Sequence, residues 1–154
     1  MKPDVTHIAS ALERAGVTGA LVEEVPTLGV VARVEPHMAG NALVALKESD
    51  HGFCFLVDVF GIDTGEVVDA VYHLRSFTRD EEVYVKVAYE YGADLASVWC
   101  IFPSALMPER ELAEMFGLTL SGHPNPKYLL LTEGIEPLLL KRIPIRTPEE
   151  VRHR

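Results

Sequence analysis

The sequence contains few of the residues with which small proteins bind metals or form cross-links. Only two of its 154 residues are cysteines, Cys54 and Cys100, and both lie in apolar runs. Two thiols alone cannot hold an iron–sulfur cluster or a structural zinc ion. We therefore expect two buried, reduced thiols and no redox cofactor or metal bound by this chain.

Motifs that carry chemistry by themselves are also missing. The sequence has no G-x-x-x-x-G-K-[ST] phosphate loop, no G-x-G-x-x-G, no H-E-x-x-H and no C-x-x-C. Its six histidines are scattered singly along the chain. The residues therefore offer no self-contained catalytic constellation.

Positive charge and long apolar runs are scarce. The 14 Lys and Arg residues face 23 Asp and Glu residues, and the net charge of −9 argues against a nucleic acid as partner. No run reaches the roughly 18 apolar residues of a membrane span, and residues 1–16 lack the apolar middle of a signal peptide. We expect a cytoplasmic protein without a direct membrane span.

Apolar periodicity predicts an α+β fold. Helical spacing covers residues 6–15 and 38–48, and a valine-rich strand covers residues 28–36. Three further strands, over residues 53–63, 66–77 and 82–91, are joined by short turns. Such strands favour a small, mostly antiparallel sheet with the N-terminal helices on one face.

One acidic residue interrupts an apolar strand. Asp58 lies in the predicted buried run 53–63, where an unpaired carboxylate would be costly. We expect a structural ion pair with Arg33 or Arg75, although acids of this kind also occur in active sites.

A short helix is predicted over residues 108–116. Pro108 suits a first helical turn, and Gly117 is placed for a left-handed cap. Glu109 and Glu111 lie in the first turn on either side of Arg110, so a charge-assisted network is expected there.

The chain after this helix combines prolines with leucines. Pro124, Pro126 and three later prolines break regular structure, yet six leucines need to be buried: Leu129, Leu130, Leu131, Leu138, Leu139 and Leu140. We therefore predict a globular domain over residues 1–122 and an extended, partner-wrapping tail over residues 123–154.

Three short motifs in order carry a family resemblance. Glu109-Arg110-Glu111, Met115-Phe116-Gly117 and Gly122-His123-Pro124 resemble the E-R-E, D-x-F-G and G-H-P pattern of the C subunit of NADH–quinone oxidoreductase (complex I). The resemblance extends over about residues 28–142. Ala105-Leu106-Met107 departs from the usual Ala-Asn-Trp, and the shorter later part is more similar to the homologous subunit of membrane-bound, energy-converting nickel–iron hydrogenases.

The resemblance implies an assembly role in a membrane-associated complex. Such a subunit binds no redox cofactor and packs on the large, hydrogenase-like or quinone-site subunit, with the small iron–sulfur subunit nearby. The iron–sulfur clusters, and a nickel–iron site in the hydrogenases, belong to these partners, and the complex lies at the inner face of the cell membrane. The partner-binding residues would be Glu109, Arg110, Glu111, Phe116, Gly117, His123, Pro124, Leu129, Leu130 and Leu138.

Two other interpretations stay open at this point. Glu109, Glu111 and His123 could serve as the acid–base groups of a small stand-alone enzyme, or the chain could be a soluble adaptor without a redox role. The sequence also leaves open the electron donor and acceptor of the complex.

Overall fold

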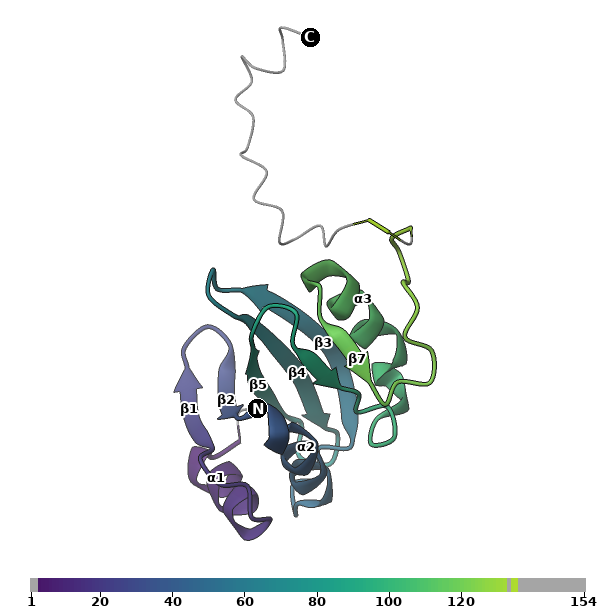
Figure 1. Ribbon diagram of the computed structural model, residues 1–154. Coiled ribbons are helices and arrows are strands. Elements are labelled where there is room, and N and C mark those ends of the chain that lie inside the picture. The colour runs from purple at the N-terminus through teal and green to yellow at the C-terminus, as the bar shows by residue number, and fades with distance from the viewer. Residues whose placement is uncertain (1–2, 133, 136–154) are drawn as a thin grey trace, which may run out of the picture.

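The computed structural model describes residues 3–132, 134 and 135, and it confirms an α+β fold with helices beside a twisted sheet (Figure 1). Its helices are α1 (Val5–Arg14), α2 (Ala39–Glu48) and α3 (Leu106–Phe116), with short 3-10 turns at Pro36–Met38 and Pro103–Ala105. Its strands are β1 (Leu21–Val25), β2 (Gly29–Val34), β3 (Phe55–Asp63), β4 (Val68–Ser76), β5 (Glu81–Tyr89), β6 (Asp94–Ala96) and β7 (Thr119–Ser121).

Five strands form the main sheet in the order β1-β2-β5-β4-β3. The predicted meander β3-β4-β5 is antiparallel throughout, and β1 and β2 form an antiparallel hairpin. The hairpin joins the meander through a parallel pairing of β2 with β5, from Val30 opposite Val83 to Val34 opposite Val87. β6 and β7 form a separate parallel pair.

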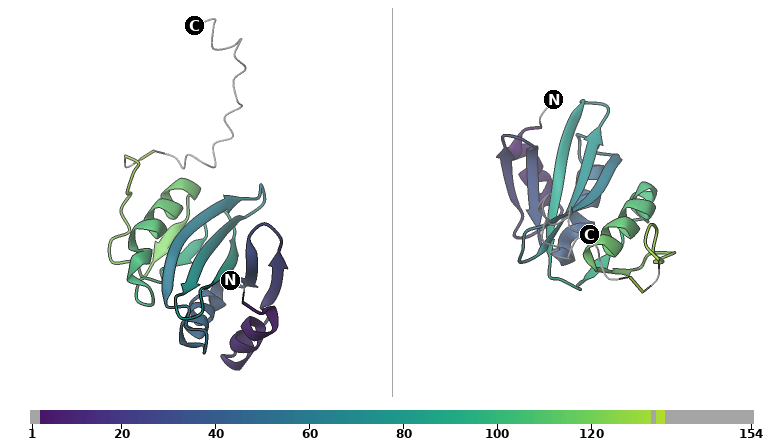
Figure 2. Two further views of the ribbon diagram at one scale, coloured as in Figure 1. Left: turned by 180° about the vertical axis from the view of Figure 1, so that it is seen from behind. Right: turned by 90° about the horizontal axis from the view of Figure 1, so that it is seen from above.

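The core lies between one face of the sheet and the three helices. Alternate residues of β5, Val83, Val85 and Val87, are fully buried on this face, because side chains of a strand alternate between its two sides. Ile8 of α1 and Leu43 of α2 pack into the same cluster. Figures 1 and 2 show the helices gathered on this side, as predicted for the N-terminal helices.

Two predictions are wrong: that both cysteines are buried, and that Asp58 forms an ion pair. Cys54 and Asp58 lie directly before or within β3, which is an edge strand of the main sheet. Cys54, directly before it, is exposed, and so is Cys100 in the loop before α3. Asp58 is exposed as well, and its carboxylate accepts a 2.8 Å hydrogen bond from the N–H of Val59 rather than an ion pair from Arg33 or Arg75. Those two arginines instead pair with other carboxylates: Arg33 with Glu23, and Arg75 with Asp80 and Glu82.

The predicted helix over residues 108–116 is present but begins two residues earlier, at Leu106. The 3-10 turn at Pro103–Ala105 leads directly into it, so Pro108 lies within the first turn rather than at its first position. Gly117 caps the helix in the left-handed region with φ of 69°, as predicted. None of the helices in the described part of the chain has the length and apolar character of a membrane span.

Candidate docking site around the last helix

A buried carboxylate fixes the loop beneath α3. Glu109 is fully buried, and its carboxylate accepts hydrogen bonds from the hydroxyl of Ser97 and, at 2.7 Å, from the N–H of Val98. Burial raises the pKa of Glu109 above its ordinary value, while these two hydrogen bonds and the nearby His123 oppose that rise. Glu109 therefore holds residues 97–98 in place rather than reaching the surface of this chain.

His123 fastens the segment after β7 to the start of α3. Its Nδ1 accepts a 3.0 Å hydrogen bond from the N–H of Asn125, and its Nε2 lies 2.9 Å from the carbonyl oxygen of Leu106. Because Nδ1 accepts, we assign the proton to Nε2, which donates to that carbonyl. Both ring nitrogens are thus used within the chain.

Two charged side chains of α3 bind the backbone of the following segment, residues 123–132, which we call the strap. One of them binds carbonyl groups of the strap and the other binds N–H groups. The guanidinium of Arg110 donates to the carbonyl oxygens of Lys127 and Tyr128 at 2.7 and 2.8 Å. The buried carboxylate of Glu114 accepts from the N–H groups of three successive residues: Leu129 at 2.6 Å, Leu130 at 2.8 Å and Leu131 at 3.4 Å.

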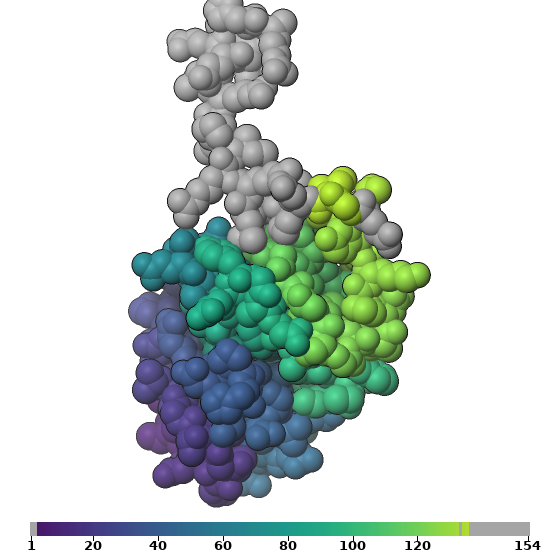
Figure 3. Space-filling view, viewed as in Figure 1, coloured from purple at the N-terminus to yellow at the C-terminus, as the bar shows by residue number. Residues whose placement is uncertain are grey.

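This arrangement corrects the expected charge network around Arg110. Its hydrogen bonds to oxygen among the described residues go to backbone carbonyls, not to the carboxylates of Glu109 and Glu111. Arg110 and Glu114 are four residues apart and therefore lie on one face of the helix. Figure 3 shows the strap lying over this flank of the molecule. Charge-assisted hydrogen bonds are roughly twice as strong as neutral ones, so the strap is well anchored.

Sequence reasoning did not predict the role of Glu114. The available signal was its spacing from Arg110, because two opposite charges at i and i+4 can hold complementary groups of one passing segment. The groups that they bind are backbone atoms, which every residue carries, so their location leaves no sign in the residue types.

The other predicted site residues are distributed over the interior, the strap and its surroundings. Phe116 is buried in the core, and Gly117 forms the helix cap. Pro124 is exposed, Leu129 is half-buried and Leu130 is 62% exposed. Leu138 lies outside the described residues. Their partner contacts stay predictions.

The acid–base interpretation loses its geometric basis here. Glu109 is buried beneath the helix, whereas Glu111 is exposed on it. His123, the third group, has both ring nitrogens in hydrogen bonds to backbone groups. A general acid or base needs hydrogen-bond reach to a substrate, and Glu109 and His123 are both buried.

A small hollow separates α3 from the edge strand. The β3–α3 hollow has a volume of about 190 Å³ and is lined by Asp58, Val59, Phe60, Gly61, Glu111, Leu112, Met115 and Phe116. Small-molecule sites typically measure roughly 300–1,000 Å³. The hollow is therefore better matched to a single side chain than to a cofactor.

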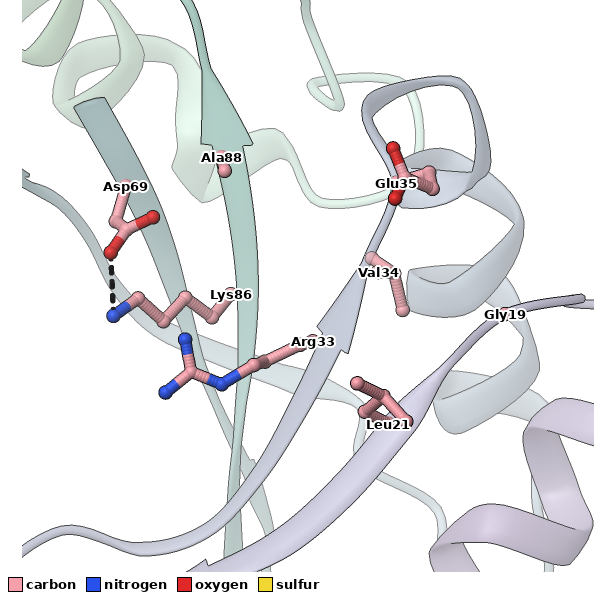
Figure 4. A pocket seen from close by; sticks show the side chains of 8 residues that line it. All are labelled: Gly19, Leu21, Arg33, Val34, Glu35, Asp69, Lys86 and Ala88. Carbon is pink, nitrogen blue, oxygen red and sulfur yellow. Dashed lines mark ion pairs between the residues drawn. The ribbon is translucent and has the colours of Figure 1, made fainter. Parts of the chain in front are cut away.

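A second hollow lies on the other face of the sheet (Figure 4) and includes Arg33 and Lys86. Both cations already have carboxylate partners. Lys86 Nζ lies 2.5 Å from Asp69 Oδ2, and Arg33 Nε lies 2.8 Å from Glu23 Oε1. The local charges are balanced, which gives no basis for an anion site. Among the described residues, no group of three or more His, Cys, Asp or Glu side chains could hold a metal ion.

Most of the chain matches one known protein family. Residues 32–149 match the family described as "Respiratory-chain NADH dehydrogenase, 30 Kd subunit". The chain belongs to this family, and the resemblance seen in the three motifs is confirmed.

The curated relatives belong to one kind of enzyme. The NADH-quinone oxidoreductase C subunit of Phenylobacterium zucineum (strain HLK1) is 36% identical over 121 residues, which cover 76% of this chain and 57% of the relative. The NADH-quinone oxidoreductase C 1 subunit of Rhizobium meliloti (strain 1021) is 32% identical over 162 residues, covering 99% of this chain and 79% of the relative. The chain thus spans little more than half the length of the first of these proteins.

Solved structures share the fold. A trypsin-resistant fragment (1-134) of Nqo5 has a TM-score of 0.65 and 25% identity, covering 77% of this chain and 98% of the fragment. A chain of the membrane-bound sulfane sulfur reductase, an archaeal respiratory membrane complex, has a TM-score of 0.68 and 23% identity, covering 84% of this chain and 76% of its own length. At that identity the second likeness speaks for the fold alone.

Proposed function

We propose that this chain is a non-catalytic, peripheral-arm subunit of a membrane-associated oxidoreductase complex of the NADH–quinone oxidoreductase or energy-converting hydrogenase type. It packs on the large catalytic subunit and the small iron–sulfur subunit and so supports electron transfer in the complex. In this proposal the iron–sulfur clusters, and any nickel–iron site, belong to the partners, and the complex holds the chain at the inner face of the cell membrane.

The observation that carries the proposal is the use of the polar residues around α3. Glu109, Arg110, Glu114 and His123 all bind groups of their own chain and shape a surface instead of converging on a substrate. That surface presents apolar side chains, with Met107 at 55% and Leu130 at 62% exposure. Exposed apolar groups beside a rigid scaffold are typical of a surface that another protein covers.

Purification of the complex tests the proposal. The chain, tagged and expressed in its own cells, should bring down a hydrogenase-like or quinone-site subunit and an iron–sulfur subunit from solubilised membranes. The chain purified alone should contain no stoichiometric iron, nickel, zinc or flavin. An untagged strain controls for non-specific capture. Turnover by the pure chain, or a stoichiometric metal in it, would contradict the proposal.

A further inference from the structure

We draw no further inference here: the strongest candidate, the exposed aromatic patch that Phe55 at the start of the edge strand β3 forms with Phe77 after β4, where the guanidinium of Arg75 lies over the Phe77 ring, carries no docking proposal because nothing in the structure shows what covers it.

Discussion

Single residues around α3 show how charge is used inside a small protein. A buried carboxylate is stable only when donors surround it, and Glu109 and Glu114 meet this condition with donors that include backbone N–H groups. Each therefore fixes a segment that has no regular secondary structure of its own. The same residue type at position 111 is exposed to solvent instead.

The raised pKa of Glu109 predicts a specific pH dependence. Between its unfolded and its higher folded pKa, the folded chain binds more protons than the unfolded chain, so this carboxyl lowers the free energy of unfolding as pH rises. Glu109→Gln removes that dependence. The melting temperature of the wild type minus that of Glu109→Gln should fall as pH rises from roughly 4 to 7. Thermal unfolding at a series of pH values measures it, with Glu111→Gln as control, and a constant difference would contradict the prediction.

Gly61 predicts a steric limit between β3 and α3. A Cβ at this position would lie 2.5 Å from Cδ1 of Leu112 and closer still to the ring of Phe116. Gly61→Ala should therefore lower the free energy of unfolding by about 1–3 kcal/mol, measured by chemical denaturation. Gly40→Ala in α2 is the matched control, because its Cβ would meet Ile101 at an ordinary 3.9 Å. Equal stability of Gly61→Ala and the wild type would show that α3 can shift away without cost.

At the scale of elements, α3 and the strap form one unit. The helix supplies a donor at Arg110 and an acceptor at Glu114, and the strap supplies the complementary carbonyl and N–H groups. A backbone bound in this way is ordered without belonging to a sheet or a helix. The leucines of the strap are thereby placed at fixed positions on the outside of the helix.

Loss of either anchor should release the strap. Glu114→Ala leaves three N–H groups without their acceptor, and Arg110→Ala leaves two carbonyl oxygens without their donor. We expect either variant to stay folded but to be cut by trypsin after Lys127 at least about tenfold faster, because a net loss near 1.5–3 kcal/mol raises the open population accordingly. Mass spectrometry of the fragments over time measures the rate.

Glu111→Ala is the control for strap release, since Glu111 is exposed on the same helix. Its cleavage rate at Lys127 should equal that of the wild type. We also expect Arg110→Ala to weaken assembly of the complex. Unchanged cleavage in both anchor variants would show that the strap is held by other contacts.

The sequence predicts local elements of this fold better than their pairing. Alternation of apolar and polar residues in 66–77 and 82–91 marks β4 and β5, because both strands bury one face against helices. β1 is harder to recognise, since Leu21–Val25 contains two adjacent glutamates and none of its residues is fully buried. The parallel contact of β2 with β5 depends on partners far apart in the chain, which periodicity does not encode.

The candidate site was predictable only in part. The charged cluster of α3, its glycine cap and the importance of His123 follow from residue types and spacing. The actual partners of Arg110, Glu114 and His123 are backbone atoms, which leave no mark on the sequence. The exposure of Asp58 escaped prediction for a related reason: a run of apolar residues does not reveal whether its strand is central or at an edge.

At the scale of the whole molecule, the predicted tail consists of the docked strap, residues 123–132, and the residues beyond it. The strap is hydrogen-bonded to α3, and residues 136–154, which contain Leu138, Leu139 and Leu140, lie outside the described part of the structure. That these later leucines bind a partner of the complex stays a prediction.

Truncation after Thr132 tests that prediction. The shortened chain keeps every described anchor of the strap, so we expect a folded protein whose melting temperature stays within a few degrees of the wild type. It should no longer co-purify with its partners, because burial of a leucine side chain contributes about 1.5–3 kcal/mol of gross transfer free energy. Truncation after Gly122 is the comparison, since it also removes the ligands of Arg110 and Glu114. Full assembly of the chain cut after Thr132 would contradict the prediction.

The parallel pairing of β2 with β5 sets an order for events during synthesis. The hairpin β1–β2 leaves the ribosome first, but the strand that completes its pairing ends at Tyr89. Until β5 has been made, one edge of β2 exposes unpaired backbone groups beside Val30 and Val31, and such an edge can pair with another chain. This edge of β2 is covered once β5 has been made and the hairpin joins the meander. The rate of translation across β3–β5 therefore sets how long each new chain is at risk of aggregation.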